Sequence, residues 1–163
     1  MPHLLRYAIV LVIVVLDQIT KIWANTSLVM YEQIPITGFF NITKAYNYGA
    51  AFSFLDNAGG WQRWLFTAIS LILSIILSVW LYRMLRSEKW LSLAIAMILG
   101  GAIGNLIDRV WYGYVIDFIQ VYWKTSYFPS FNIADAAITC GAIIMLGLTL
   151  FEKNAASTDV TTK

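Results

Sequence analysis

The chain has 163 residues, 60% of them hydrophobic and only 12% charged, and its mean hydropathy is +0.69. These values exclude an ordinary soluble protein and indicate one domain, covering residues 1–163, that is integral to a membrane. The net charge of +2, without a basic run or a stacking-aromatic motif, argues against nucleic acid as a partner. The one cysteine, Cys140, and the one histidine, His3, leave no disulfide, Ser-His triad or His-ligated metal for the core. We therefore expect neither metal nor cofactor, and any hydrolytic chemistry falls to carboxylates.

Four apolar segments are each close to the roughly 20 residues needed to cross about 30 Å of hydrocarbon. They predict helices over about residues 6–24, 62–84, 90–110 and 133–152. Residues 7–16 alone have the length of a signal-peptide core, but no small-x-small cleavage site follows, so we interpret them as part of the first span. The sequence thus predicts an all-α membrane protein with four transmembrane helices.

Two further segments, 25–61 and 111–132, are too polar to span and are expected outside the bilayer. The first contains short extended runs at 28–33, 39–43 and 49–54, which predict a small extracytoplasmic β-sheet between helices one and two. The aromatic loop 118–131 suits the membrane interface, either as a moving lid or as a fixed anchor. The polar residues 154–163 predict a disordered tail.

The basic residues are distributed unevenly between the two sides. One side carries Arg6, Arg83, Arg86, Lys89, Lys153 and Lys163, and the loops of the other carry Lys44, Arg63 and Lys124. Positive-inside bias then places both termini in the cytoplasm. Because the four helices alternate in direction, the acidic groups late in helices one and three and early in helix four share the outer level.

Two of these acidic groups have basic neighbours. Asp17 and Lys21 are spaced i,i+4 near the end of the first helix, where they either only neutralise each other or brace a site. Asn105, Asp108 and Arg109 share one face of the third helix, so Arg109 is expected to compensate Asp108. The same helix has a small-residue face, which we interpret as architecture for close packing; its members are Ala96, Gly100, Gly101 and Gly104.

Asp117 and Asp135 are the aspartates left without an obvious partner. Asp117 stands between Ile116 and Phe118, an apolar setting that favours a raised pKa. Asn132 is placed to cap helix four, which puts Asp135 in its first turn; a simple helix-terminus charge is the alternative for Asp135. Two carboxylates brought close share a proton, so that one can activate water while the other protonates or polarises a peptide carbonyl. We interpret Cys140 as a packing residue, since no histidine is near it.

Two other classes of protein remain open on these residues alone. A proton-coupled or ion-conducting membrane protein also places acids within helices, but here the acids gather at one side and leave helix two empty. A structural assembly protein would use the glycine face and the aromatic ends, yet it has no need for two uncompensated aspartates.

The chain resembles the lipoprotein signal peptidase, or signal peptidase II, family along nearly its whole length. Five blocks carry the resemblance in the family's order and spacing: Asp17-Gln-x-x-Lys21, Asn47-x-Gly-Ala-Ala-Phe-Ser, Gly104-Asn-x-x-Asp-Arg109, Val115-Ile-Asp-Phe118 and Phe131-Asn-Ile-Ala-Asp135. The resemblance implies an aspartic endopeptidase of the bacterial inner membrane. It removes the signal peptide of a prolipoprotein, cutting just before a cysteine that carries diacylglycerol.

On the matched positions, the resemblance implies that Asp117 and Asp135 are the catalytic pair. The residues that it implies line or support the site, or bind substrate there, are Asn47, Asn105, Asp108, Arg109 and Asn132, with Asp17 and Lys21 bracing it. It also implies a sheet in the first outer segment that cradles the substrate and a short helix over the site after Asp117. The expected partners are the lipid-modified prolipoprotein and membrane lipid, the expected site lies near the extracytoplasmic face, and the enzyme is expected to act as a monomer.

Overall fold

The computed structural model describes residues 1–49 and 59–160, and within them it has four long helices and four strands. In chain order the elements are α1 (His3–Ser27), β1 (Gln33–Thr37), β2 (Phe40–Asn47), α2 (Trp61–Arg83), α3 (Lys89–Trp111), β3 (Val115–Trp123), β4 (Ser126–Tyr127) and α4 (Ile133–Val160). Each helix has a stretch long and apolar enough to cross a membrane. The predicted four-span fold class is therefore confirmed, with helix ends within a few residues of those expected except at the end of α4.

The helix α3 is the centre of the bundle and packs against α1, α2 and α4. Its glycines face two different neighbours: a Cβ at Gly100 would lie 2.9 Å from Cβ of Ile13 in α1, and a Cβ at Gly101 would collide with the carbonyl oxygen of Ala134 in α4. In α4, a Cβ at Gly141 would lie 2.7 Å from the Ala94 carbonyl oxygen. The small-residue face predicted for α3 thus allows close backbone contact with its neighbours, as is typical of membrane helix pairs.

A buried arginine fixes α1 against the end of α2. The guanidinium of Arg6 is fully buried and donates to the carbonyl oxygens of Leu81, Met84 and Leu85 at 2.8, 2.9 and 2.6 Å. The last carbonyls of a helix have no partner within it, and a cation there also complements the helix dipole. The sequence analysis used Arg6 only to infer the orientation in the membrane, and the structure adds that it joins α1 to the end of α2.

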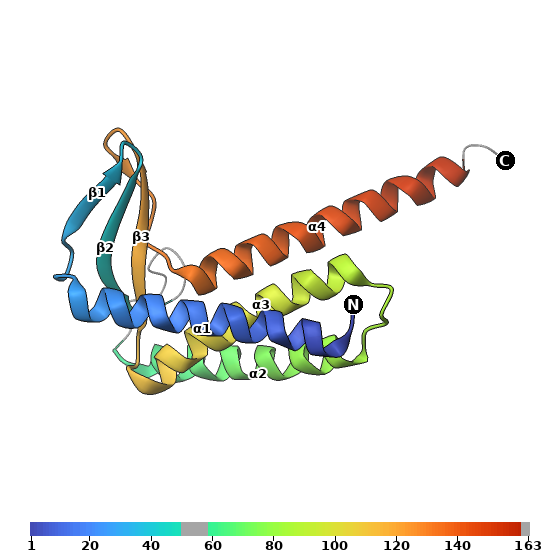
Figure 1. The fold of residues 1–163 in the computed structure, drawn as a ribbon, viewed down its shortest axis with the longest axis horizontal. Helices are drawn as coiled ribbons and strands as arrows, with labels where there is room; N and C mark the ends of the chain where they lie inside the picture. The colour runs from blue at the N-terminus through green and yellow to red at the C-terminus, as the bar shows by residue number, and fades with distance from the viewer. Residues whose placement is uncertain (50–58, 161–163) are drawn as a thin grey trace.

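The sheet stands at one end of α1, α2 and α3, while the N-terminus and the α2–α3 turn lie at the other end (Figure 1). Its strand order is β1-β2-β3-β4, all antiparallel. Two of its four strands, β3 and β4, therefore lie in the outer segment 111–132, for which the sequence analysis predicted an aromatic loop at 118–131 and no strand. The short helix expected after Asp117 is wrong, because the described residues there form β3 and the hairpin to β4.

The strand expected at 28–33 is also wrong. Helix α1 continues to Ser27, with the Thr26 hydroxyl donating to the carbonyl oxygens of Ile22 and Trp23, and a turn at Tyr31 with φ of 61° delays β1 until Gln33. The strand expected at 39–43 is confirmed as the first part of β2. The one expected at 49–54 lies, beyond Gly49, outside the described residues.

The C-terminal tail differs from expectation as well. Helix α4 runs on to Val160, so residues 154–160, predicted to be disordered, are helical. The segment contains no proline or glycine to end the helix, and backbone hydrogen bonding continues past the apolar span.

Candidate active site

Three buried charges join α1 to α3. The Lys21 ammonium lies 2.8 Å from Asp17 Oδ2 and 3.1 Å from Asp108 Oδ2, and all three side chains are at most 1% exposed. The expected pairing of Asp108 with Arg109 is therefore wrong. Adjacent helical residues point in different directions, and Asp108 turns towards α1.

The same two aspartates hold backbone from the later part of the chain. Asp17 Oδ1 accepts a hydrogen bond of 2.9 Å from the N–H of Ala134, in the first turn of α4. Asp108 Oδ2 accepts one of 3.1 Å from the N–H of Ile116 in β3, next to Asp117. The ion cluster thus fixes both elements that bear the unpartnered aspartates. A Cβ at Gly104 would lie 2.5 Å from Asp17 Oδ2, so only glycine leaves room for this carboxylate.

Asn132 connects the two remaining aspartates. Its side-chain oxygen accepts from the Asp135 N–H at 2.9 Å, and its own N–H donates to Asp135 Oδ2 at 3.3 Å, so it caps α4 as predicted. Its side-chain nitrogen donates to Asp117 Oδ1 at 2.7 Å. Asp117 on β3 and Asp135 on α4 are therefore connected by one residue, although they are 18 positions apart in the chain.

Asparagines supply the other hydrogen bonds to this pair. Asn47 donates to Asp117 Oδ2 at 3.2 Å, and Asn105 donates to Asp135 Oδ1 at 2.7 Å. The amide of Asn105 is oriented by Lys21, whose ammonium can only donate and does so to Asn105 Oδ1 at 2.9 Å. Among the described residues, neither Asp117 nor Asp135 has an ion pair within 4 Å.

This environment raises the pKa of Asp117 to about 7. The main cause is burial, since the side chain is 2% exposed, and the neighbouring charge of Asp135 acts in the same direction. Hydrogen bonds from Asn47 and Asn132 and the charge of Lys21 offset part of the increase. Near neutral pH this carboxyl group can therefore either release or take up a proton.

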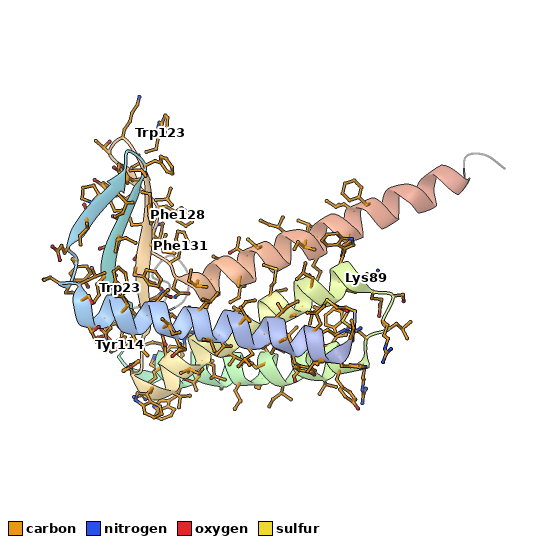
Figure 2. The ribbon with its side chains drawn as sticks, in the orientation of Figure 1. Trp23, Lys89, Tyr114, Trp123, Phe128 and Phe131 are labelled. Carbon is orange, nitrogen blue, oxygen red and sulfur yellow. The ribbon has the colours of Figure 1, made fainter. Side chains whose placement is uncertain are left out.

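A cavity of about 840 Å³ opens beside the pair. It is bounded by the sheet, by residues 128–131 and by the first turns of α4, and both carboxylates line it together with Asn47, Asn105 and Arg109. Phe128 and Phe131 lie between the sheet and the start of α4 (Figure 2). The Arg109 guanidinium donates to the Gly49 carbonyl oxygen at 3.2 Å, so it contributes positive charge to the cavity rather than to Asp108.

The structure adds residues that the sequence analysis missed. Gln18, inside the first motif, donates to Asp108 Oδ1 at 3.0 Å, and its place between Asp17 and Lys21 was the available signal. The cavity also includes Tyr31, Gln33 and Gln120, which no local pattern singled out. Cys140 was interpreted as packing, but it is exposed and lines the cavity from α4. A helix that meets a cavity on one side leaves such a residue without neighbours to pack against.

The carboxylates are held in a fixed geometry beside a large cavity, at one end of a bundle of membrane spans. This arrangement indicates an integral membrane enzyme. A solved structure described as a bacterial membrane enzyme has the same fold: the two are 32% identical and superimpose with a TM-score of 0.82 over 91% of this chain and 88% of the other.

Sequence comparison places the chain more closely. The family model described as "Signal peptidase (SPase) II" matches residues 9–151. The lipoprotein signal peptidase of Pseudomonas putida is 54% identical over 144 residues, covering 87% of this chain and 84% of the relative. That of Shewanella piezotolerans is 50% identical over 155 residues, covering 94% and 88%. The chain belongs to the signal peptidase II family, which makes it a protease of a bacterial membrane.

Proposed function

We propose that the protein is an aspartic endopeptidase that removes the signal peptide from diacylglyceryl-modified prolipoproteins, cutting on the N-terminal side of the lipidated cysteine. The observation that carries the proposal is the contact of Asn132 with both Asp117 and Asp135 at the wall of one cavity. Family membership and the relatives named lipoprotein signal peptidase support the substrate.

In the proposed reaction the aspartate pair carries one proton. The ionised member takes a proton from a water molecule, whose oxygen attacks the peptide carbonyl carbon, while the protonated member gives its proton to the carbonyl oxygen. When the tetrahedral intermediate collapses, the C–N bond breaks, the protonated aspartate gives its proton to the departing amine, and the ionised aspartate takes a hydroxyl proton as the carbonyl group re-forms, so that the pair again carries one proton. The raised pKa of Asp117 suits this exchange at neutral pH. Arg109 lines the same cavity and its charge interacts with those of Asp135 and Asp117, so we assign it the stabilisation of developing negative charge.

The remaining residues have supporting roles in the proposal. Asn47, Asn105 and Asn132 orient the two carboxylates, and Asp17, Lys21 and Asp108 hold α1, α3, α4 and β3 in register around them. Only carboxylates, amides and one guanidinium take part, so the reaction needs no metal or cofactor. We propose that the enzyme acts as a monomer and that its partners are the prolipoprotein and membrane lipid, not nucleic acid.

We further propose that the site lies near the extracytoplasmic face of the inner membrane and that both termini are cytoplasmic. Trp23 and Tyr114 lie at the sheet end of the bundle and Lys89 at the opposite end (Figure 2), where α2 ends at Arg83 and the turn to α3 contains Arg86. Basic residues favour the cytoplasmic side. Helix α4 diverges from the other three (Figure 1), and its first turns line the cavity, so we propose that a lipid-bound substrate enters beside α4.

The proposal is tested with purified protein in lipid. One reaction contains a diacylglyceryl-modified precursor and another the same precursor without lipid, and product masses are measured in both. We expect cleavage only of the modified precursor, directly before the cysteine, by the wild type and not by Asp117→Asn. Cleavage of both precursors at equal rates would contradict the requirement for the lipid modification. A fully active Asp117→Asn would contradict the aspartate mechanism.

A further inference from the structure

The cavity has two chemically different ends. Towards the membrane it is lined by α4, with Ala136, Thr139 and Cys140, and α4 is a membrane span. Away from the membrane it is lined by the sheet, with Gln33 and Gln120. If the acyl chains of the substrate lie at the α4 end, the polypeptide that follows the lipidated cysteine leaves past the sheet.

The pairing of β3 is irregular between Asp117 and Gln120: Ile42 of β2 pairs with Ile119, but Ala45 pairs with Asp117. In a regular strand, residues three apart point to opposite faces. Here the N–H groups of Phe118 and Ile119 both donate to the Phe131 carbonyl oxygen, at 3.0 and 2.8 Å, so two residues oppose one. Such a bulge re-aims the following side chains and often lies next to an active site. As a result, Asp117 and Gln120 both line the cavity.

Amide side chains from three strands meet at this position. Gln120 Oε1 accepts hydrogen bonds from Gln33 Nε2 at 3.0 Å and from Asn41 Nδ2 at 3.3 Å. With that oxygen engaged, Gln120 Nε2 and Gln33 Oε1 have no hydrogen-bond partner among the described residues. One is a donor and the other an acceptor, the two groups that an extended peptide needs for its C=O and N–H.

A residue of unusual backbone conformation lies beside this cluster. Tyr31 has a φ of 61°, is exposed, and lines the cavity next to β1. A non-glycine residue in this region is uncommon and costs free energy, and such residues concentrate at ligand clamps. The N–H of Tyr31 donates to the Lys44 carbonyl oxygen at 2.8 Å, which holds the turn in place.

We propose that Gln33 and Gln120 form a binding subsite for the mature polypeptide, at about the third residue after the bond that is cleaved. Gln120 is three positions along β3 from Asp117, a distance of roughly 10 Å at about 3.3 Å per residue. An extended substrate covers the same distance with three residues. The subsite binds the peptide backbone, so it accepts any side chain there. This inference rests on the proposed function, because it assumes that Asp117 marks the reacting bond.

The test compares Gln120→Leu and Gln33→Leu with the wild type on two lipidated precursors. One ends in the carboxamide of the lipidated cysteine, and the other continues for five residues. We expect each variant to lose about three- to tenfold in kcat/KM on the long precursor, through KM, as suits the loss of one or two hydrogen bonds. On the short precursor both variants should match the wild type, which also shows that they are folded.

Backbone N-methylation sharpens the test. Two long precursors are compared, one methylated on the peptide nitrogen of the third residue after the cut and one on that of the fourth. One of the two methyl groups should slow cleavage by the wild type. This effect should disappear in Gln33→Leu. Val121→Thr, the neighbouring position on β3 that lines a different hollow, is the matched control and should retain wild-type kinetics on both precursors.

Equal losses on both precursors, or no loss on either, would overturn the subsite. So would a methylation effect that persists in Gln33→Leu. These outcomes are distinct from failure of the proposed function, in which the wild type cleaves neither precursor and the subsite fails with it.

Discussion

The described residues contain two groups of aspartates, one fully buried and one in which Asp117 is buried and Asp135 partly so, and the groups differ in what surrounds their carboxylates. Asp17 and Asp108 share the ammonium of Lys21 and accept hydrogen bonds from backbone of other elements. Asp117 and Asp135 receive hydrogen bonds from neutral asparagines and open onto the cavity. The first group is therefore a structural cluster whose opposite charges compensate one another, whereas in the second group burial raises the pKa of Asp117 to about 7, so that this carboxyl group can exchange a proton near neutral pH.

This comparison shows that the surroundings of a carboxylate, and above all whether it has a counter-ion, decide whether it stabilises the fold or exchanges protons. A buried charge with a hydrogen-bonded counter-ion is stable in place, and removing the partner is costly. A buried carboxylate without a counter-ion shifts its pKa and binds protons instead. Lys21 belongs to both settings, because it also orients the Asn105 amide that binds Asp135.

The largest expected effect is on catalysis. Asp117→Asn and Asp135→Asn each remove the shared proton, and each should lower the rate of signal-peptide cleavage by at least roughly 10²–10⁴-fold. Thermal unfolding in detergent should show a folded protein, because asparagine is nearly isosteric with aspartate. Cleavage rates are followed by product mass. Near-normal turnover by either variant would exclude that aspartate from the reaction.

The next effect is on stability and concerns the other group. Lys21→Met leaves Asp17 and Asp108 buried without a counter-ion, so it should destabilise the fold by about 3–5 kcal/mol and lower the yield. The unfolding midpoint is the measurement, and Lys89→Met, at an exposed site at the opposite end, is the control. An unchanged midpoint together with lost turnover would contradict the structural role of the cluster.

A smaller loss of stability is expected from crowding the first group. In Gly104→Ala the added methyl would lie 2.5 Å from Asp17 Oδ2, so the carboxylate must move, at a cost of about 1–3 kcal/mol. Gly147→Ala is the matched control, because nothing lies within 4 Å of its added methyl and alanine favours the helix. Equal midpoints for the two variants would show that the Asp17 position is adjustable.

The smallest effect is a shift in pH dependence. The pKa of Asp117 is about 7, so the singly protonated pair is lost, and activity should fall, as pH rises through 7. Asn47→Ala removes a hydrogen bond that favours the ionised form, so the pKa should rise further and the descending limb should move to higher pH, by up to about one unit. A downward shift would mean that Asn47 favours the protonated form.

The same pKa predicts a stability profile. Because the folded-state value is raised above the usual 3.8, Asp117 stabilises the fold fully below that value, and this contribution is lost as pH rises through about 7. The unfolding midpoint of Asp117→Asn should lack this part of the decline. If the unfolding midpoint of the variant fell between pH 4 and 7 as steeply as that of the wild type, other groups would be the cause of the decline.

Much of the site was predictable from the sequence because its polar residues are conspicuous among apolar spans. Asp117 and Asp135 stood out by lacking partners, and the cap at Asn132 followed from its place before α4. The partner of Asp108 was predicted wrongly, because spacing within one helix does not show which way a side chain turns between two neighbours. Gln33 and Gln120 carried no signal, since amides in a strand look like ordinary surface residues.

The sequence by itself determined the four spans, the membrane class and the acids available for chemistry, because long apolar runs and charges within them have few other physical explanations. Only the tertiary structure decided that β3 joins β2, that Lys21 serves Asp108, and that Gln120 lines the same cavity as Asp117. These features depend on contacts between residues far apart in the chain, and such contacts leave no periodic trace in the local sequence.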